Sequence, residues 1–387
     1  MAPSGRSPAL RLINAQNAPA RQGNGMTLIL VGTQPRIIFP VLRAAHLLGH
    51  TTLVLGSQGT RSLRWSPGCA AHVLAELGDT QASGAVLREL VKTHAEATVV
   101  PCDCDGIRFL QRIRDATLPT VPMPSLGALE VLDDKWRFWQ LCEQHGLSVP
   151  RTIHAPRCAD LDFDQVVSAV GLPFVVKPTC ESGSRGVVIV RERKDLRDQV
   201  MANEHYPPGP VIAQTYIAGC DIDADLLAVD GQVRLLATHR VHEHWTDFGR
   251  HAHLEDLAKT LCRITDFSGP MNIDARLEEN TGRVYLVEAN PRFWASVDLA
   301  LAAGLDFLAA SLEPPDALRM GPEWIRVNRR HPLLRPREWP GLLTSRAPEA
   351  RLARALLMDP GAGVALVKEI PGMAARRLAG LARSGGK

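Results

Sequence analysis

The sequence has no long apolar run. Its longest apolar stretches, such as 27–31 and 172–176, have the length of a β-strand, whereas a membrane-spanning helix needs about 20 apolar residues. Residues 1–25 carry Arg6, Arg11 and Arg21 and no acidic residue, and they lack the apolar segment of a secretory signal. We expect 1–25 to be a disordered leader; an organelle transit peptide and a true start at Met26 are the alternatives.

The sequence also lacks the cysteine pattern of a disulfide framework or a zinc site. Its eight cysteines are scattered, and the one close pair, Cys102 and Cys104, has no second pair to complete a metal set. Scattered cysteines in a chain of 387 residues favour a reducing compartment. The predicted location is therefore the cytoplasm.

Length and charge indicate a folded protein of several units. A chain of 387 residues, with 45% hydrophobic and 22% charged residues, predicts two or three packed units. From 321 to 387 there are 13 Lys and Arg against 5 Asp and Glu. Solvated Arg-rich helices docked on the protein are the favoured interpretation of this basic tail, and contact with an acidic membrane surface is the alternative. No nucleic-acid partner is predicted.

Short β-rich runs alternate with helical stretches from residue 27, without internal repeats. Such alternation predicts βαβ units around a parallel sheet, as in a Rossmann-like domain. The expected strands are 27–32, 51–55 and 97–101, and the expected helices are 37–48, 86–94 and 107–116. The first turn, 32–36, lacks the pattern G-x-G-x-x-G, so a scaffold role is preferred to dinucleotide binding.

The middle of the chain predicts a second sheet-rich region, followed by a helical tail. One helix is expected over 133–145, ended by Gly146. Residues 271–277 and 283–288 predict a hairpin across the turn 279–282. The other expected strands are 174–178, 187–190, 211–217 and 222–229, and the tail helices are 350–357 and 373–383.

Three stretches carry candidate chemistry. In the first, Lys177 ends a strand before the glycine-rich loop 179–186. An ammonium and backbone N–H groups in such a loop suit a polyphosphate, because glycine permits close backbone approach.

The second stretch is the hairpin, where Asp274, Glu288 and Asn290 offer the hard oxygen ligands that Mg²⁺ prefers. Arg292 follows and is suited to hold a phosphoryl group through two hydrogen bonds. The third stretch runs from Gln214 to Asp221. Its extended backbone suits an adenine, and its terminal carboxylate suits ribose hydroxyls.

In this order and spacing the three stretches resemble the ATP-grasp superfamily, especially the ATP-binding part of carbamoyl-phosphate synthetase large chains and similar carboxylate–amine ligases. The resemblance covers about 27–308, and its most specific part is the run from Glu288 to Ser296. It implies an α/β protein with 26–130 as a Rossmann-like pre-ATP-grasp domain and 131–312 as a two-lobed α+β ATP-grasp domain, its lid lobe at about 150–213. Residues 313–387 would form a basic, partly helical extension.

The resemblance also implies roles for individual residues. The residues implied to bind ATP are Lys135, Lys177, Ser182, Gly183, Ser184, Gly186, Gln214, Tyr216, Ile217 and Asp221. Asp274, Glu288 and Asn290 would hold Mg²⁺ or Mn²⁺, while Arg292 and Lys177 would be catalytic. Relatives often carry Glu at the position of Gln214 and Glu or Gln at that of Asp274, so the metal contact of Asp274 is the weakest assignment.

No sequence motif marks the pocket that would bind the acceptor substrate, which the resemblance places near Arg240. Arg240 or Arg250 is preferred as the ligand of a substrate carboxylate; a zinc site at His242 and His244, or an exposed surface, is the alternative.

The implied function is an ATP-dependent ligase that joins a small-molecule carboxylate to an amine through an acyl phosphate, releasing ADP and phosphate. A bicarbonate-using carboxylase or carbamoyl-phosphate-type synthetase is the enzymatic alternative. A catalytically silent nucleotide-binding assembly protein is the alternative of another class, and a homodimer is left open.

Overall fold

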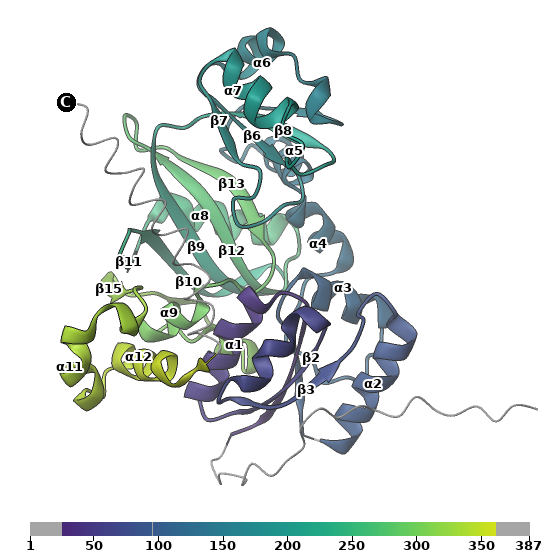
Figure 1. The fold of residues 1–387 in the computed structure, drawn as a ribbon, viewed down its shortest axis with the longest axis vertical. Helices are drawn as coiled ribbons and strands as arrows, with labels where there is room; N and C mark the ends of the chain where they lie inside the picture. The colour runs from purple at the N-terminus through teal and green to yellow at the C-terminus, as the bar shows by residue number, and fades with distance from the viewer. Residues whose placement is uncertain (1–24, 95, 361–387) are drawn as a thin grey trace, which may run out of the picture. The chain divides into compact units, whose positions relative to one another are not determined.

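The computed structural model describes residues 25–94 and 96–360, which divide into two compact units (Figure 1). The first unit consists of the described parts of Met1–Val121, Ala295–Leu308 and Val327–Lys387. The second consists of Pro122–Trp294 and Ala309–Arg326.

The first unit contains a parallel four-stranded sheet in the order β3-β2-β1-β4. Leu28 to Val31 in β1 are fully buried, as expected for a parallel strand covered on both faces. The predicted strands and helices of this region are confirmed; β3 is an additional strand. The bounds are β1 (Thr27–Gly32), α1 (Pro35–Leu47), β2 (Thr51–Gly56), β3 (Cys69–Leu74), α2 (Thr80–Thr93), β4 (Thr98–Pro101) and α3 (Cys104–Ile113).

The turn after β1 is occupied by a side chain of the same chain. Oδ2 of Asp103 accepts hydrogen bonds from the backbone N–H groups of Thr33 at 2.8 Å and Gln34 at 2.7 Å. Its Oδ1 accepts from Gly106 N at 2.9 Å, which caps α3. Because Asp103 fills the position where a dinucleotide-binding turn would present N–H groups to phosphate, the turn serves the scaffold.

The C-terminal part of the first unit is helical. Its elements are α9 (Val297–Ala302), α11 (Trp339–Thr344) and α12 (Pro348–Met358). The apolar face of α12 is buried at Leu352 and Ala353, and Nη2 of Arg351 donates to the carbonyl of Leu47. The helix predicted over 350–357 is confirmed, whereas 373–383 and the leader lie outside the described residues. Among the residues described, no helix has both the length and the apolar character to cross a membrane.

The larger sheet of the second unit has the order β13-β12-β9-β10-β11-β15, with β14 paired to β10. The predicted hairpin is confirmed as the antiparallel pair β12 and β13. Helix α8, which was not predicted, buries Leu254, Leu257 and Leu261 in the core of this sheet. The bounds are β9 (Gly219–Val229), β10 (Gln232–Val241), β11 (Trp245–Gly249), α8 (Ala252–Ile264), β12 (Gly269–Glu278), β13 (Val284–Asn290), α10 (Phe307–Leu312), β14 (Arg319–Met320) and β15 (Trp324–Asn328).

The smaller sheet of the second unit is antiparallel, in the order β5-β8-β6-β7. It has its own core, in which Phe174 and Val176 of β6 are fully buried. In Figure 1, α6 and α7 lie with this sheet. The bounds are β5 (Thr152–Ala155), α6 (Phe163–Val170), β6 (Phe174–Pro178), β7 (Val188–Val190), α7 (Arg193–Leu196) and β8 (Val211–Thr215).

The helix predicted over 133–145 is confirmed with a start two residues later, and a further helix that was not predicted precedes it. Two helices, α4 (Leu126–Asp133) and α5 (Lys135–Gln144), meet at Asp134, which has an extended backbone. Oδ1 of Asp134 accepts from the N–H groups of Trp136 and Arg137, both at 2.9 Å. The carboxylate is therefore the N-cap of α5, and the break places Lys135 at the first position of that helix.

Candidate active site

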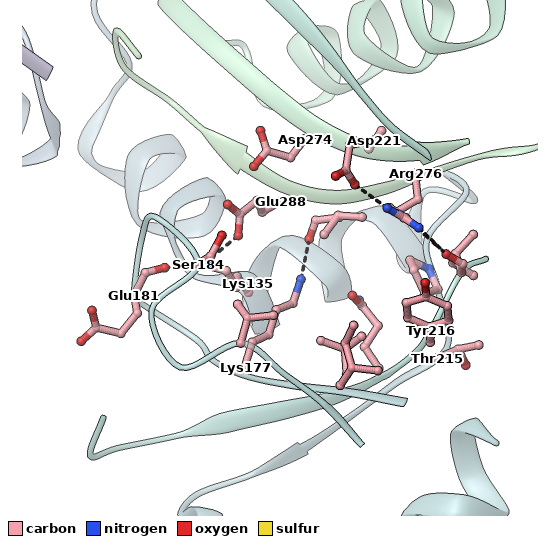
Figure 2. Close-up of a pocket in the computed structure, with 18 of the residues that line it drawn as sticks. Lys135, Lys177, Glu181, Ser184, Thr215, Tyr216, Asp221, Asp274, Arg276 and Glu288 are labelled. Carbon is pink, nitrogen blue, oxygen red and sulfur yellow. Dashed lines mark hydrogen bonds and ion pairs between the residues drawn. The ribbon is translucent and has the colours of Figure 1, made fainter. Parts of the chain in front are cut away.

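A cavity of about 500 Å³ lies within the second unit, between the two sheets (Figure 2). One part of its wall is apolar and includes Pro150, Val175, Ile189 and Ile217. The remainder carries charges of both signs. The charged and polar side chains on the wall include Lys135, Lys177, Glu181, Arg185, Gln214, Asp221, Asp223, Asp274, Arg276 and Glu288. Figure 2 shows Lys177 and Glu288 toward one end of the cavity, which we call the charged end, and Tyr216 toward the other, which we call the apolar end although Arg276 also lies there. A wall that combines apolar and charged side chains suits a ligand that has an aromatic part and an anionic part.

Lys177 comes from β6, one residue before the proline that ends the strand. The side chain is buried, and its Nζ lies 3.4 Å from the carbonyl oxygen of Val287. Burial lowers the pKa of Lys177 to about 8, because the nearby carboxylate of Glu288 offsets only part of the cost of desolvation. This ammonium is available to an anion in the cavity.

Lys135 connects three parts of the site. Its backbone N–H donates to Thr179 O at 2.9 Å, and its Nζ donates to Glu181 O at 2.6 Å. The same Nζ lies 2.9 Å from Oε2 of Glu288. Lys135 thus joins the start of α5, the glycine-rich loop and the hairpin; Figure 2 shows it near Glu288.

Asp274 and Glu288 are direct register partners on β12 and β13. Burial by itself raises the pKa of Glu288, but Lys135 and Lys177 outweigh it and lower that pKa to about 2. Burial, together with the charges of Asp223 and Glu288, raises the pKa of Asp274 well above its usual range. Glu288 is therefore the more readily ionised member of the pair.

The loop over the charged end is shaped by left-handed backbone. Gly183, Ser184 and Gly186 have φ values of 67°, 62° and 74°. A Cβ on Gly186 would come within 2.8 Å of the Pro178 ring, and the hydroxyl of Tyr206 donates to Gly186 O at 2.8 Å. Glycine is required at 186 both by its conformation and by close packing.

The other end of the cavity is organised by an arginine that was not predicted. Arg276 of β12 lies 2.7 Å from Asp221 and donates to the carbonyl oxygens of Ile217 and Gly219. Gln214 is buried, and its Nε2 donates to Oγ1 of Thr152 at 2.9 Å. Arg276 therefore fixes the segment that follows β8.

The structure brings most of the predicted site residues together. Those on the cavity wall are Lys135, Lys177, Ser184, Gln214, Tyr216, Ile217, Asp221, Asp274 and Glu288; those away from it are Ser182, Gly183, Gly186, Asn290 and Arg292. Arg292 is buried, and its Nη2 donates to Oδ1 of Asn290 at 2.9 Å. Asn290 and Arg292 therefore begin a polar network beside the cavity.

The two predicted substrate arginines, Arg240 and Arg250, do not line the cavity. Arg250 is bound through two hydrogen bonds to Glu255, at 2.6 and 2.9 Å. His242 of the zinc alternative pairs with Asp247 at 3.2 Å. Within the described part of the chain, no three His, Cys, Asp or Glu side chains form a metal-binding group, so that alternative gains no support.

The part of the sequence that forms the cavity matches a known protein family. Residues 132–296 match the family described as the ATP-grasp domain. They carry the loop, the hairpin, the smaller sheet and every strand of the larger sheet except β14 and β15.

Residues 132–296 are an ATP-grasp domain.

Curated relatives share this domain at modest identity. The chain is 26% identical over 187 residues to the arginine-specific carbamoyl phosphate synthase large chain of Bacillus subtilis, covering 43% of this chain and 17% of that one. It is 29% identical over 199 residues to the D-alanine–D-alanine ligase of Cupriavidus taiwanensis, covering 49% and 57%. The chain thus spans less than two thirds of the length of either relative.

Solved ATP-grasp structures share the fold over more of the chain. The L-amino acid ligase from Bacillus licheniformis aligns with a TM-score of 0.54 and 19% identity, covering 75% of each chain. The N5-carboxyaminoimidazole synthetase from Staphylococcus aureus, complexed with ADP, aligns with a TM-score of 0.59 and 15% identity, covering 76% of this chain and 79% of that one.

Sequence reasoning missed four charged residues of the ATP-grasp domain. Arg276 and Asp223 lie on the cavity wall, and Asp225 and His239 are buried beside it. For Asp223 and Asp225 the available signal was their alternate spacing in the expected strand 222–229, because alternate residues of a strand share one face.

Proposed function

We propose that this chain is an ATP-dependent carboxylate–amine ligase that forms an acyl phosphate and releases ADP and phosphate. The observation that carries the proposal is the cluster of Lys135, Lys177 and Glu288 at the charged end of the cavity, beneath a glycine-rich loop. Two cations beside one ionised carboxylate leave a net positive site for phosphate oxygens, with a carboxylate retained for a metal.

The proposed roles follow the position of each residue. The adenine would lie at the apolar end, beside Gln214, Tyr216 and Ile217, with Asp221 near the ribose. Lys135 and Lys177 would hold phosphate oxygens, and Ser182, Gly183, Ser184 and Gly186 would form the covering loop. Arg292 would hold the transferring phosphoryl group.

The carboxylates fit a divalent cation. Asp274 and Glu288 face each other across paired strands, and burial, together with the charges of Asp223 and Glu288, raises the pKa of Asp274. Such a pair favours a hard cation, and Mg²⁺ takes one or two carboxylates together with substrate phosphate oxygens. Asp274, Glu288 and Asn290 would hold Mg²⁺ or Mn²⁺, which when bound offsets negative charge on the phosphates.

The reaction then asks the protein mainly for positioning and for exclusion of water. A carboxylate oxygen of the substrate attacks the γ-phosphorus, and the bond to the ADP oxygen breaks. Attack by the amine displaces phosphate from the acyl carbon. The loop 179–186 would shield the labile acyl phosphate from hydrolysis until the amine arrives.

The domain boundaries belong to the same proposal. Residues 26–130 would be the pre-ATP-grasp domain, 131–312 the ATP-grasp body and 313–387 the extension. Its substrates would be small molecules, and the cytoplasm remains the predicted location.

The deciding experiment measures ADP release from ATP and Mg²⁺ with panels of amino acids, peptides and sugar acids as carboxylate and amine. Turnover that requires both the carboxylate and the amine, with ADP as the nucleotide product, supports a ligase. AMP as product contradicts it. Absence of ADP formation with every pair, alongside intact ATP binding, favours the silent nucleotide-binding alternative.

The match to a carbamoyl phosphate synthase large chain specifically favours bicarbonate as a second candidate carboxylate. The same assay with bicarbonate as the sole carboxylate separates the two reactions. ADP formation with bicarbonate alone, and none with organic carboxylates, would replace the first candidate with the second.

A further inference from the structure

Two rows of polar side chains cross the large sheet beside the cavity. Asp274 is the register partner of Glu288 on β13 and of Asp223 on β9, and we call these three residues the acidic row. Asn272 is likewise the partner of Asn290 and Asp225. We call these three residues, two amides and one carboxylate, the amide row. The rows are two residues apart on every strand, so they share one face of the sheet.

The two rows meet at His239 on β10. Its Nε2 lies 3.1 Å from Oδ2 of Asp223, and its Nδ1 lies 3.0 Å from Oδ2 of Asp225. The contact with Asp225 is a close ion pair whose alignment falls short of a hydrogen bond. His239 is 4% exposed and Asp225 is 0% exposed, so both charges are removed from solvent.

The histidine places a counter-charge beside the buried Asp225 carboxylate. Burial by itself lowers the pKa of His239, but Asp225 and Asp223 outweigh that effect and raise it well above its usual value. The other charged groups that act on this cluster are Asp221 of β9, which lies near Asp223, and Asp274 of β12, which interacts with Asp223 and His239 and is itself coupled to Glu288. A buried carboxylate stays charged only with such a partner.

The carboxylate of Asp225, with His239 as its counter-charge, determines how the amide row is oriented. It only accepts hydrogen bonds, so Asn272 must present its Nδ2 to Asp225, which it does at 3.1 Å. The Oδ1 of Asn272 then accepts from Nδ2 of Asn290 at 3.1 Å. Asp225 thus fixes the orientation of the Asn272 amide, and Asn272 fixes that of the Asn290 amide.

The last link reaches the proposed phosphoryl site. With its nitrogen turned toward Asn272, Asn290 presents its oxygen on the other side, where Nη2 of Arg292 donates to it at 2.9 Å. If the amide were reversed, two donors would face each other and Arg292 would be displaced. A carboxamide also binds a cation through its oxygen and not its nitrogen.

We propose that Asp225 and His239 form a positioning pair, which through Asn272 fixes the Asn290 carboxamide with its oxygen toward Arg292 and the metal site. The inference rests on the proposed function and deepens it, since it assigns residues that support the ligands rather than touch the substrate. Substitution of a supporting partner of this kind typically lowers metal affinity or activity about 10- to 100-fold.

The test uses Asp225→Asn in the full-length chain. Asparagine preserves shape but both donates and accepts, so Asn272 and Asn290 lose their unique orientation. The matched control is His242→Gln, at the exposed end of the same region. ADP affinity is measured by calorimetry with and without Mg²⁺, and Mn²⁺ binding in the presence of ADP is followed by electron paramagnetic resonance.

We expect the metal-dependent part of ADP binding to weaken about 10- to 100-fold in Asp225→Asn, while metal-free ADP affinity stays within about twofold. His242→Gln should match the wild type in both. An equal loss of ADP affinity with and without metal would show that Asp225 has only a structural role and would overturn the proposal. Unchanged metal dependence in a folded variant would overturn it as well.

A second variant covers the case in which Asp225→Asn does not fold, since removing one member of a buried ion pair is strongly destabilising. Asp225→Asn combined with His239→Gln removes both charges, and the introduced glutamine side chain can still donate to Asp223. This double variant should recover stability but not metal dependence. If the wild type itself shows no metal-dependent ADP binding, the proposed function fails; if the wild type shows it and the variants match the wild type, the positioning pair alone fails.

Discussion

Replacing Glu288 by Gln removes the one ionised carboxylate that lies between Lys135 and Lys177. Burial alone would raise the pKa of Glu288, yet the two lysines lower it from 4.5 to about 2. A difference of this size corresponds to about 3 kcal/mol in favour of the ionised form in the folded chain. Loss of that charge leaves the two ammonium groups facing each other without a counterion.

Asp274 limits the damage to stability. Its pKa is raised in part by Glu288, so it ionises more readily once its neighbour is neutral. We therefore expect Glu288→Gln to lower the free energy of unfolding by about 1–2 kcal/mol at neutral pH, within the usual range for a single substitution. The folded chain should persist.

The effect on turnover should be far larger than the effect on stability. Loss of one charged or hydrogen-bonding group that acts on a developing transition state typically costs about 10²- to 10³-fold in rate. ADP release is measured by a coupled assay on protein whose melting curve confirms folding. Glu278→Gln, a half-buried position on the same hairpin that is not on the cavity wall, is the matched control and should behave as wild type.

The pH dependence of stability provides an independent check. Because the folded pKa of Glu288 lies below the unfolded value, its stabilising effect is present above about pH 4.5 and is lost as the pH falls toward 2. Glu288→Gln should flatten this part of the acid unfolding curve. Near-normal turnover in a folded variant, or an acid unfolding curve identical to that of the wild type, would refute the role assigned to the charge of Glu288.

Three further predictions concern other parts of the chain. Because burial lowers the pKa of Lys177 to about 8, metal-free ATP affinity should fall as the pH rises through that value; Lys177→Arg, which stays charged, should remove this fall, and an identical fall in the variant would exclude Lys177 as its origin. With the correct carboxylate and ATP, hydroxylamine should trap a hydroxamate, and ¹⁸O from that carboxylate should enter the released phosphate; label found in AMP would instead indicate adenylation. Deleting residues 350–387 removes Leu352 and Ala353 from a buried face, so the melting temperature should drop by several degrees; equal stability, with only the full-length form sedimenting on anionic vesicles, would support the membrane alternative.

Local sequence determines much of both the fold and the cavity wall. Strands such as β1 are continuous apolar runs, and apolar residues with strand spacing have few alternatives to a buried sheet. The hairpin β12–β13 follows from two β-rich runs around a short turn. Lys177, the loop glycines and Glu288 were predicted because they are close in sequence to such elements and belong to motifs.

What only the tertiary structure decided concerns residues joined by strand register. Asp134 sets the exact start of the helix predicted over 133–145, because its side chain caps α5 and Lys135 becomes the first helical residue. His239 meets Asp223 and Asp225 because β9 and β10 pair in one particular register, and Asn290 meets Asn272 for the same reason on β12 and β13. A shift of one residue in either pairing would turn these side chains to the opposite face, and register depends on the packing of the whole sheet.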